Sequence, residues 1–283
     1  MKASTTTEIY LQSAREALNA GNYAAAEADA DKMIEADPQS YRAWFIKGEA
    51  AGWQTTGTDN RFAESTADWI NAYQCTPKNK KREIGSQIQG SAEKISTAIL
   101  TMRCNNFKAL QDKNCKTGIL DCLAMINEQF AAIRDKTQID LYTAALKNKF
   151  AGILNTTAAE VGRAINGEFG EDSKTRVRLG RTARTHTKLS WEHLIESTDC
   201  CLALLETAYY LSTDDGLCFE ICKNYIDLVN LTKETCSGRR IPKKYRCVPG
   251  SGIPGSPVKY GPEEISQWER KKDIHDPEKR NGN

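Results

Sequence analysis

Proline is scarce in most of the chain. Of the eight prolines, only Pro38 and Pro77 precede residue 242. A proline inside a helix removes a backbone hydrogen bond and costs about 3 kcal/mol, so its scarcity leaves most of the chain free to be helical. We therefore expect an all-α fold for residues 1–237. Prolines and glycines are concentrated after residue 238, where we expect an extended linker.

Long apolar runs are also missing. No stretch of about 18 uncharged apolar residues occurs, as a transmembrane helix would require. The N-terminal sequence MKASTTTEIYLQSAR lacks the apolar segment of a signal peptide. The formal net charge of +2 favours neither nucleic acid nor a membrane surface as the partner. We expect a cytoplasmic protein with no membrane partner.

Motifs for catalysis are absent from the sequence. HExxH, GxSxG, GxxxxGK[ST] and a GxGxxG after a strand do not occur, and the chain has only three histidines. His186 and His193 are seven residues apart, which would put both on one side of a helix, but no carboxylate lies at metal-ligand spacing. We interpret them as a solvated pair. The sequence therefore predicts no enzyme and no cofactor, and nothing specific supports cysteine–histidine chemistry.

The ten cysteines could suggest a metal site, but their spacing does not. The closest pairs are Cys200 with Cys201, Cys218 with Cys222, and Cys236 with Cys247. None has the two-residue gap of a zinc knuckle. Four cysteines fall on apolar stripes, where cysteine packs as a small hydrophobic residue: Cys122, Cys201, Cys218 and Cys222. We expect packing rather than metal ligation.

What the chain does contain is helical periodicity divided by short breaks. Apolar and small residues recur at helical spacing from Thr7 to Ala36, with a break at Gly21, where glycine can adopt the left-handed conformation that ends a helix. Asp37 precedes Pro38 and is therefore disfavoured in the α region, so it should end the second helix. A third helix is expected to begin near Tyr41. These breaks predict antiparallel helix pairs.

Small, aromatic and proline residues occupy regular places in these pairs. They are Ala14, Gly21, Ala26, Pro38, Trp44, Gly48, Trp69 and Pro77. The pattern resembles the tetratricopeptide repeat (TPR) family, as found in bacterial repeat proteins, over about residues 6–79. Pro38 and Pro77 are 39 residues apart rather than 34, and the excess fits a longer turn at residues 53–60. The resemblance implies a right-handed TPR-like α-solenoid at residues 1–79, packed on further helices.

Further helices are predicted behind this block by periodicity alone. Apolar stripes begin at Ile84, Leu120, Tyr142, Leu194 and Cys218, and a short separate helix is indicated by Val161, Ile165 and Phe169. Residues 80–237 should complete the α domain, either by continuing the solenoid or by folding back as a bundle. Within residues 238–283, Pro262 begins a short helix that carries Ile265 and Trp268 on one face and stops at Pro277.

A basic segment interrupts the later helices. If residues 174–188 are helical, one face carries Lys174, Arg178, Arg181 and Lys188. Such a face could bind phosphate, an acidic partner or nucleic acid, although the segment has no aromatic side chain for stacking on bases. An exposed loop is the alternative. A regulator that binds nucleic acid or a phosphate-bearing ligand is therefore the second functional hypothesis.

The favoured hypothesis is a non-catalytic scaffold or adaptor. In the TPR family the first helix of each pair lines a concave surface that holds a peptide or a partner protein. The matching positions include Arg15, Asn19, Arg42, Phe45, Glu49 and Trp53. We expect Arg15, Asn19 and Arg42 to hold a carboxylate through charge-assisted hydrogen bonds, with Phe45 and Trp53 as apolar anchors.

Overall fold

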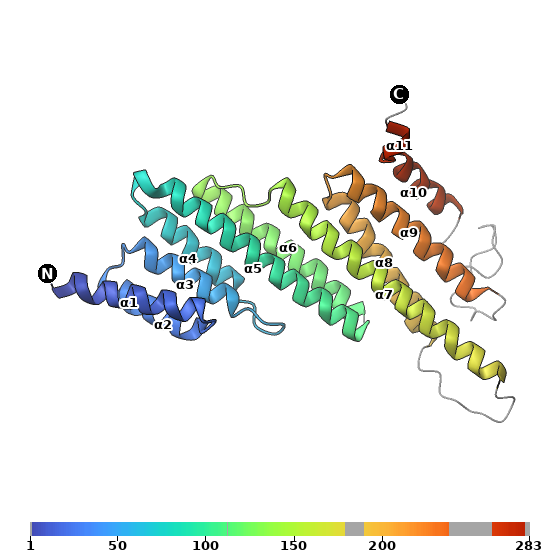
Figure 1. Ribbon diagram of the computed structural model, residues 1–283, viewed down its shortest axis with the longest axis horizontal. Helices are drawn as coiled ribbons and strands as arrows, with labels where there is room; N and C mark the ends of the chain where they lie inside the picture. Colours follow the sequence, from blue (N-terminus) through green and yellow to red (C-terminus); the bar gives the residue numbers. More distant parts are fainter. Residues whose placement is uncertain (1, 112, 179–189, 238–261, 281–283) are drawn as a thin grey trace. The chain divides into compact units, whose positions relative to one another are not determined.

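A computed structural model describes residues 2–111, 113–178, 190–237 and 262–280. The described residues form helices and no strand, which confirms the all-α prediction (Figure 1). The first four helices are α1 (Lys2–Asn19), α2 (Tyr23–Ala36), α3 (Tyr41–Trp53) and α4 (Phe62–Cys75). The later ones are α5 (Lys81–Leu110), α6 (Lys113–Thr137), α7 (Ala144–Arg178), α8 (Trp191–Leu211), α9 (Asp215–Cys236), α10 (Pro262–Ile274) and α11 (Pro277–Arg280).

The breaks between the first helices lie where the sequence predicts them. Gly21 has φ +74°, and the Asn22 side chain accepts a hydrogen bond from the backbone N–H of Ala25 at the start of α2. Asp37 is extended, with φ −145°, and ends α2 one residue before Pro38. The backbone therefore turns at these points for local reasons.

Helices α3 and α4 cross closely at Gly48. A Cβ atom added to Gly48 would lie 2.7 Å from Cδ1 of Trp69 and 2.9 Å from the carbonyl oxygen of Ser65. Trp69 is fully buried. Glycine fits here because the Trp69 ring and the Ser65 carbonyl oxygen leave no room for a side chain, as the pattern of small residues predicts.

The chain forms two compact units, which are described separately. Unit 1 consists of residues 1–103 and 120–143, and unit 2 of residues 104–119 and 144–283. Unit 1 thus extends beyond residue 79 and includes most of α5 and α6. Its core joins these helices to the first four: Phe62 of α4 packs against Phe130 of α6, with ring centroids 6.1 Å apart, and Thr66 of α4 donates to Gln129 of α6.

Unit 2 has its core among α7, α8 and α9, which contact one another pairwise. The expected separate helix at Val161, Ile165 and Phe169 is wrong, because α7 continues through these positions as one helix of 35 residues. No proline or helix-ending glycine conformation interrupts it. A Cβ on Gly162 would lie 2.6 Å from Leu228, so α7 and α9 approach each other closely there.

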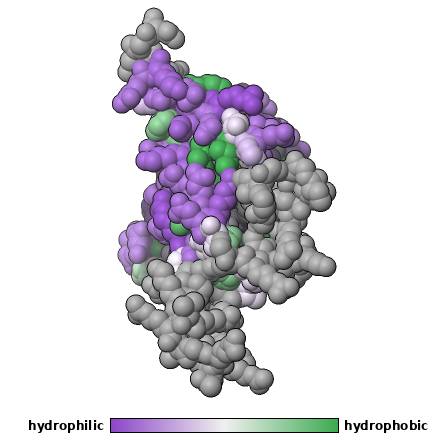
Figure 2. Space-filling model, turned by 90° about the vertical axis from the view of Figure 1, so that its right-hand side faces the viewer, coloured by the Kyte–Doolittle hydropathy of each residue, from purple (hydrophilic) through white to green (hydrophobic). Residues whose placement is uncertain are grey.

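The described residues on the face drawn in Figure 2 are mostly hydrophilic, with hydrophobic residues in small areas between them. The apolar stripes supply buried side chains to both units, for example Ile88 and Ile95 in unit 1 and Leu194 and Leu205 in unit 2. Within the described part of the chain, none of the helices is both long and apolar enough to cross a membrane.

Candidate functional site

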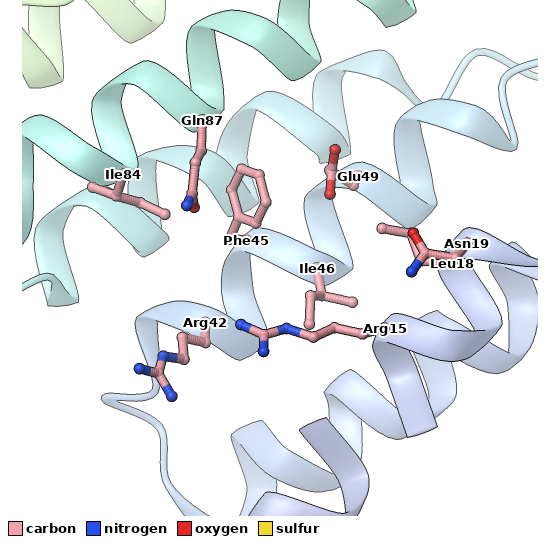
Figure 3. Close-up of a pocket in the computed structure, with 9 residues that line it drawn as sticks. All are labelled: Arg15, Leu18, Asn19, Arg42, Phe45, Ile46, Glu49, Ile84 and Gln87. Atoms are coloured by element: carbon pink, nitrogen blue, oxygen red, sulfur yellow. The ribbon is translucent and has the colours of Figure 1, made fainter. Parts of the chain in front are cut away.

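Unit 1 contains a pocket of about 300 Å³ between α1, α3 and α5 (Figure 3). The residues that line it are Arg15, Leu18, Asn19, Arg42, Phe45, Ile46, Glu49, Ile84 and Gln87. Five of the six residues predicted for the groove are therefore in one pocket. The sixth, Trp53, is not.

Helical spacing explains why these side chains meet. Arg42, Phe45 and Glu49 are three and four residues apart and share one face of α3, as Arg15, Leu18 and Asn19 do on α1. The two helices belong to successive pairs, and α5 begins the third. The first helix of each pair thus supplies one wall of the pocket.

The positive charges of the pocket are not neutralised within it. Among the described residues, no carboxylate lies within ion-pair distance of Arg15 or Arg42, and both side chains are exposed. Arg42 Nε donates to the hydroxyl of Tyr41 over 3.3 Å, which leaves its charge uncompensated. In Figure 3 the guanidinium group of Arg15 points toward the side of the pocket where Arg42 lies. The two arginines could therefore hold one anionic group together.

The pKa of the Tyr41 hydroxyl reflects two neighbouring cations, Arg42 and Lys80. Burial tends to raise the pKa of its phenol, but hydrogen bonds from Arg42 and Lys80 outweigh burial, so the pKa is lowered. The Lys80 ammonium lies 3.4 Å from the same hydroxyl. This end of the pocket consequently has a positive electrostatic potential.

Glu49 occupies the opposite end of the pocket, near Asn19. Burial raises the pKa of its carboxyl, although a hydrogen bond from Ser91 and the charge of Lys94 act in the other direction. Ser91 Oγ donates to Glu49 Oε1 over 2.5 Å. Among the described residues, Glu49 forms no ion pair with Arg15 or Arg42.

The pocket also offers apolar surface. Phe45 is half-buried on α3, and the buried side chains of Ile46 and Ile84 lie on either side of it in Figure 3. A partly open aromatic ring beside two guanidinium groups suits a ligand with an apolar group next to an acidic one.

A second pocket of about 310 Å³ shares Arg42 with the first. It lies between α1 and the junction of α2 with α3, and its lining includes Glu8, Leu11 and Met33. Arg42 therefore contributes to a binding surface that is longer than one pocket.

The prediction for Trp53 needs correction. The Trp53 ring stacks on Tyr23 of α2, with centroids 5.9 Å apart and planes 13° from parallel. Trp53 is the last residue of α3 and therefore contacts the start of α2 rather than a ligand pocket. It contributes to packing between the first and second helix pairs.

The basic segment, residues 174–188, lies only partly within the residues that the structure describes. Lys174 and Arg178 belong to α7, which ends at Arg178. Arg181 and Lys188 lie outside the described residues, as does His186. His193 is half-buried, with Nε2 3.4 Å from Oε1 of Gln111, so it is not simply solvated. Binding of phosphate or nucleic acid by this segment stays a prediction.

The cysteines predicted to pack in the core are buried there: Cys122, Cys201, Cys218 and Cys222. Burial raises the pKa of the Cys222 thiol to about 12 and also raises that of Cys201, so the reactive thiolates are disfavoured. No group of three or more potential metal ligands occurs among the described residues.

Sequence reasoning missed the contribution of α5 to the pocket. The periodicity places Ile84 on an apolar stripe and gives no signal at Gln87, one turn later, yet both residues line the pocket. The available signal was positional: α5 follows α4 as the first helix of a third pair, so its early residues could be expected to extend the same surface.

Comparisons with protein-family models, with curated proteins and with solved structures found no match for this chain. Assignment of a function therefore depends on the geometry of the pocket.

Proposed function

We propose that the protein is a non-catalytic interaction module that binds an acidic peptide segment of a partner protein in the pocket between α1, α3 and α5. In this proposal residues 1–79 form TPR-like helix pairs, and the pocket belongs to their concave face. The observation that carries the proposal is the pair of arginines, Arg15 and Arg42, without a carboxylate partner among the described residues, beside the half-buried ring of Phe45.

The chemistry of the pocket suits a carboxylate. A guanidinium group donates two parallel hydrogen bonds to a carboxylate, and a hydrogen bond to a charged group contributes about 1.5–3 kcal/mol. The ligand's carboxylate would lie between Arg15 and Arg42, and a neighbouring apolar side chain would contact Phe45. The side-chain amides of Asn19 and Gln87, both exposed, can bond the backbone of an extended peptide.

A peptide array tests this proposal. Each acidic peptide on the array is paired with a version in which Asp and Glu are replaced by Asn and Gln. The wild-type chain should prefer the acidic peptides, and binding should weaken as salt is raised. The Arg15→Ala/Arg42→Ala/Phe45→Ala variant should lose at least about tenfold in affinity, because two charged hydrogen-bond donors and the anchor are removed.

Arg134→Ala is the matched control. Arg134 is an exposed arginine of α6 that does not line the pocket, so its loss changes the net charge without changing the site. This variant should bind like the wild type. Identical peptide binding by the wild type and the triple variant would refute the proposal, as would equal binding of the acidic and amide peptides.

A further inference from the structure

Helix α10 lies against α9 in unit 2, following a stretch of 24 residues, 238–261, that the structure does not describe (Figure 1). Trp268 is the only side chain of α10 that is buried, whereas α9 buries nine of its side chains. A helix that belonged to the core would bury a continuous stripe. The attachment of α10 instead combines one buried anchor, the side chain of Trp268, with polar contacts on either side of it.

The anchor is an aromatic cluster. The Trp268 ring stacks on Tyr225 of α9, with centroids 4.0 Å apart and planes 16° from parallel. Its other neighbour is Tyr209 of α8, which meets it edge to face at 5.4 Å. Trp268 is 4% exposed, so both contacts are shielded from water. Stacked and edge-to-face contacts of this kind add to the free energy gained by burying the ring.

Polar contacts on the same face of α10 position the anchor. The Tyr225 hydroxyl donates to Glu264, one turn before Trp268. Lys271 Nζ lies 3.9 Å from the centroid of the Trp268 ring and 4.7 Å from that of Tyr209, so its charge interacts with both rings.

The end of α10 is held by a histidine. His275 Nδ1 lies 2.7 Å from Oδ1 of Asp215, and His275 Nε2 lies 3.1 Å from the Tyr209 hydroxyl. The contact residues of α10 and its end, Glu264, Trp268, Lys271 and His275, follow a spacing of four, three and four. This spacing defines one helical face.

We propose that Tyr209, Asp215 and Tyr225 form a helix-docking surface, that α10 is its built-in occupant, and that α10 must leave before a partner can bind. The partner that fits is an amphipathic helix with a glutamate, a tryptophan and a lysine at the spacing of Glu264, Trp268 and Lys271. We call the three residues on α8 and α9 the latch face.

Two physical arguments support the release of α10 from the latch face. A helix of 13 residues is marginal in water by itself, so the helicity of α10 depends on its contact with the latch face. The covalent connection keeps α10 near this face, so a partner helix must compete with it. Weakening the Trp268 anchor should therefore open the latch face to a helix supplied from outside.

Binding of a labelled synthetic peptide of residues 262–280 to the full-length chain, followed by fluorescence anisotropy, tests the proposal. The Trp268→Ala chain should bind this peptide at least tenfold more tightly than the wild-type chain, whose latch face is occupied. Glu269→Ala, an exposed neighbour on the same helix, should bind like the wild type. A peptide that carries Trp268→Ala should bind neither chain.

Hydrogen–deuterium exchange completes the test. In the Trp268→Ala chain the amides of α10 should exchange faster, while those of α8 and α9 should stay protected. Unchanged protection of α10, or equal peptide binding by the Trp268→Ala and wild-type chains, overturns the proposal.

Lys271→Met is the second variant for the same binding test, for use if Trp268→Ala disturbs α8 and α9. This variant keeps the tryptophan anchor and removes only the charge over the rings. It should bind the peptide at least about two- to fivefold more tightly than the wild type, because the cation–π contacts of Lys271 are lost. Equality with the wild type overturns the proposal in that case.

Discussion

At the scale of single residues, Asp68 is an unfavourably buried carboxylate in unit 1. It is 8% exposed on α4, and no hydrogen-bond donor among the described residues reaches it. Burial raises its pKa to about 6, against the attraction of Lys47 and with the repulsion of Asp31, Glu27 and Glu64. Lys47 is itself bonded to Asp31 over 2.7 Å, so it does not compensate Asp68 directly.

Asp68→Asn should therefore stabilise the protein at neutral and alkaline pH. The folded-state pKa of about 6 is above the ordinary value of 3.8, so the native state binds the proton more tightly than the unfolded state does. The stability contributed by protonated Asp68 is complete below about pH 4 and is lost as the pH rises through 6. Urea unfolding should show a gain on the order of 2 kcal/mol for Asp68→Asn at pH 8 and almost none at pH 4.

Asp31→Asn provides the control. Asp31 is 46% exposed and paired with Lys47, and its charge also repels Asp68, so its replacement should change the stability at pH 8 by no more than about 1 kcal/mol in either direction. If Asp68→Asn is neutral or destabilising at pH 8, the buried carboxylate is not an unfavourable charge.

At the scale of elements, the crossing of α3 and α4 determines the geometry of the second helix pair. Gly48→Ala should destabilise the protein by about 1–3 kcal/mol, because the new methyl group meets the fully buried Trp69 and the backbone oxygen of Ser65, neither of which can move freely. Thermal and urea unfolding measure the change.

Gly90→Ala is the matched comparison, since a Cβ at Gly90 in α5 meets nothing within 4 Å. This substitution should stabilise by about 0.5–1 kcal/mol, through the higher helix propensity of alanine. Equal effects of the two substitutions would show that the crossing is looser than the structure indicates.

The elements also show what sequence could predict. Gly21, Asp37 and Pro38 act on the backbone locally, so the ends of α1 and α2 follow from single residues. The extent of α7 is harder to predict, because residues 155–160 contain no proline or glycine to end a helix but also no large apolar residue to continue the stripe. Five pocket residues are predicted from the resemblance to the TPR family, whereas the stacking of Trp53 on Tyr23 joins two helices and is not predicted.

At the scale of the whole molecule, the boundary at residue 79 that the repeat pattern indicates is not where the core of unit 1 ends. A Cβ on Gly52 of α3 would lie 2.8 Å from Ile95 of α5, and Phe62 of α4 packs on Phe130 of α6. Both contacts join the first four helices to later ones. The apolar faces of α3 and α4 are therefore covered by residues that lie beyond 79 in the sequence.

A fragment of residues 1–79 should consequently show no cooperative unfolding transition. A fragment of residues 1–143 should unfold cooperatively. The shorter fragment lacks Ile95 and Phe130, so Phe62 is exposed in it. Exposure of Phe62 alone removes about 1.5–3 kcal/mol of hydrophobic stabilisation, and a domain of this size has a low free energy of unfolding. Far-UV circular dichroism during urea titration distinguishes the two fragments. A sharp transition in residues 1–79, with the same midpoint as in residues 1–143, would mean that the first two helix pairs form a complete core, and that α5 and α6 cover a surface that is already stable.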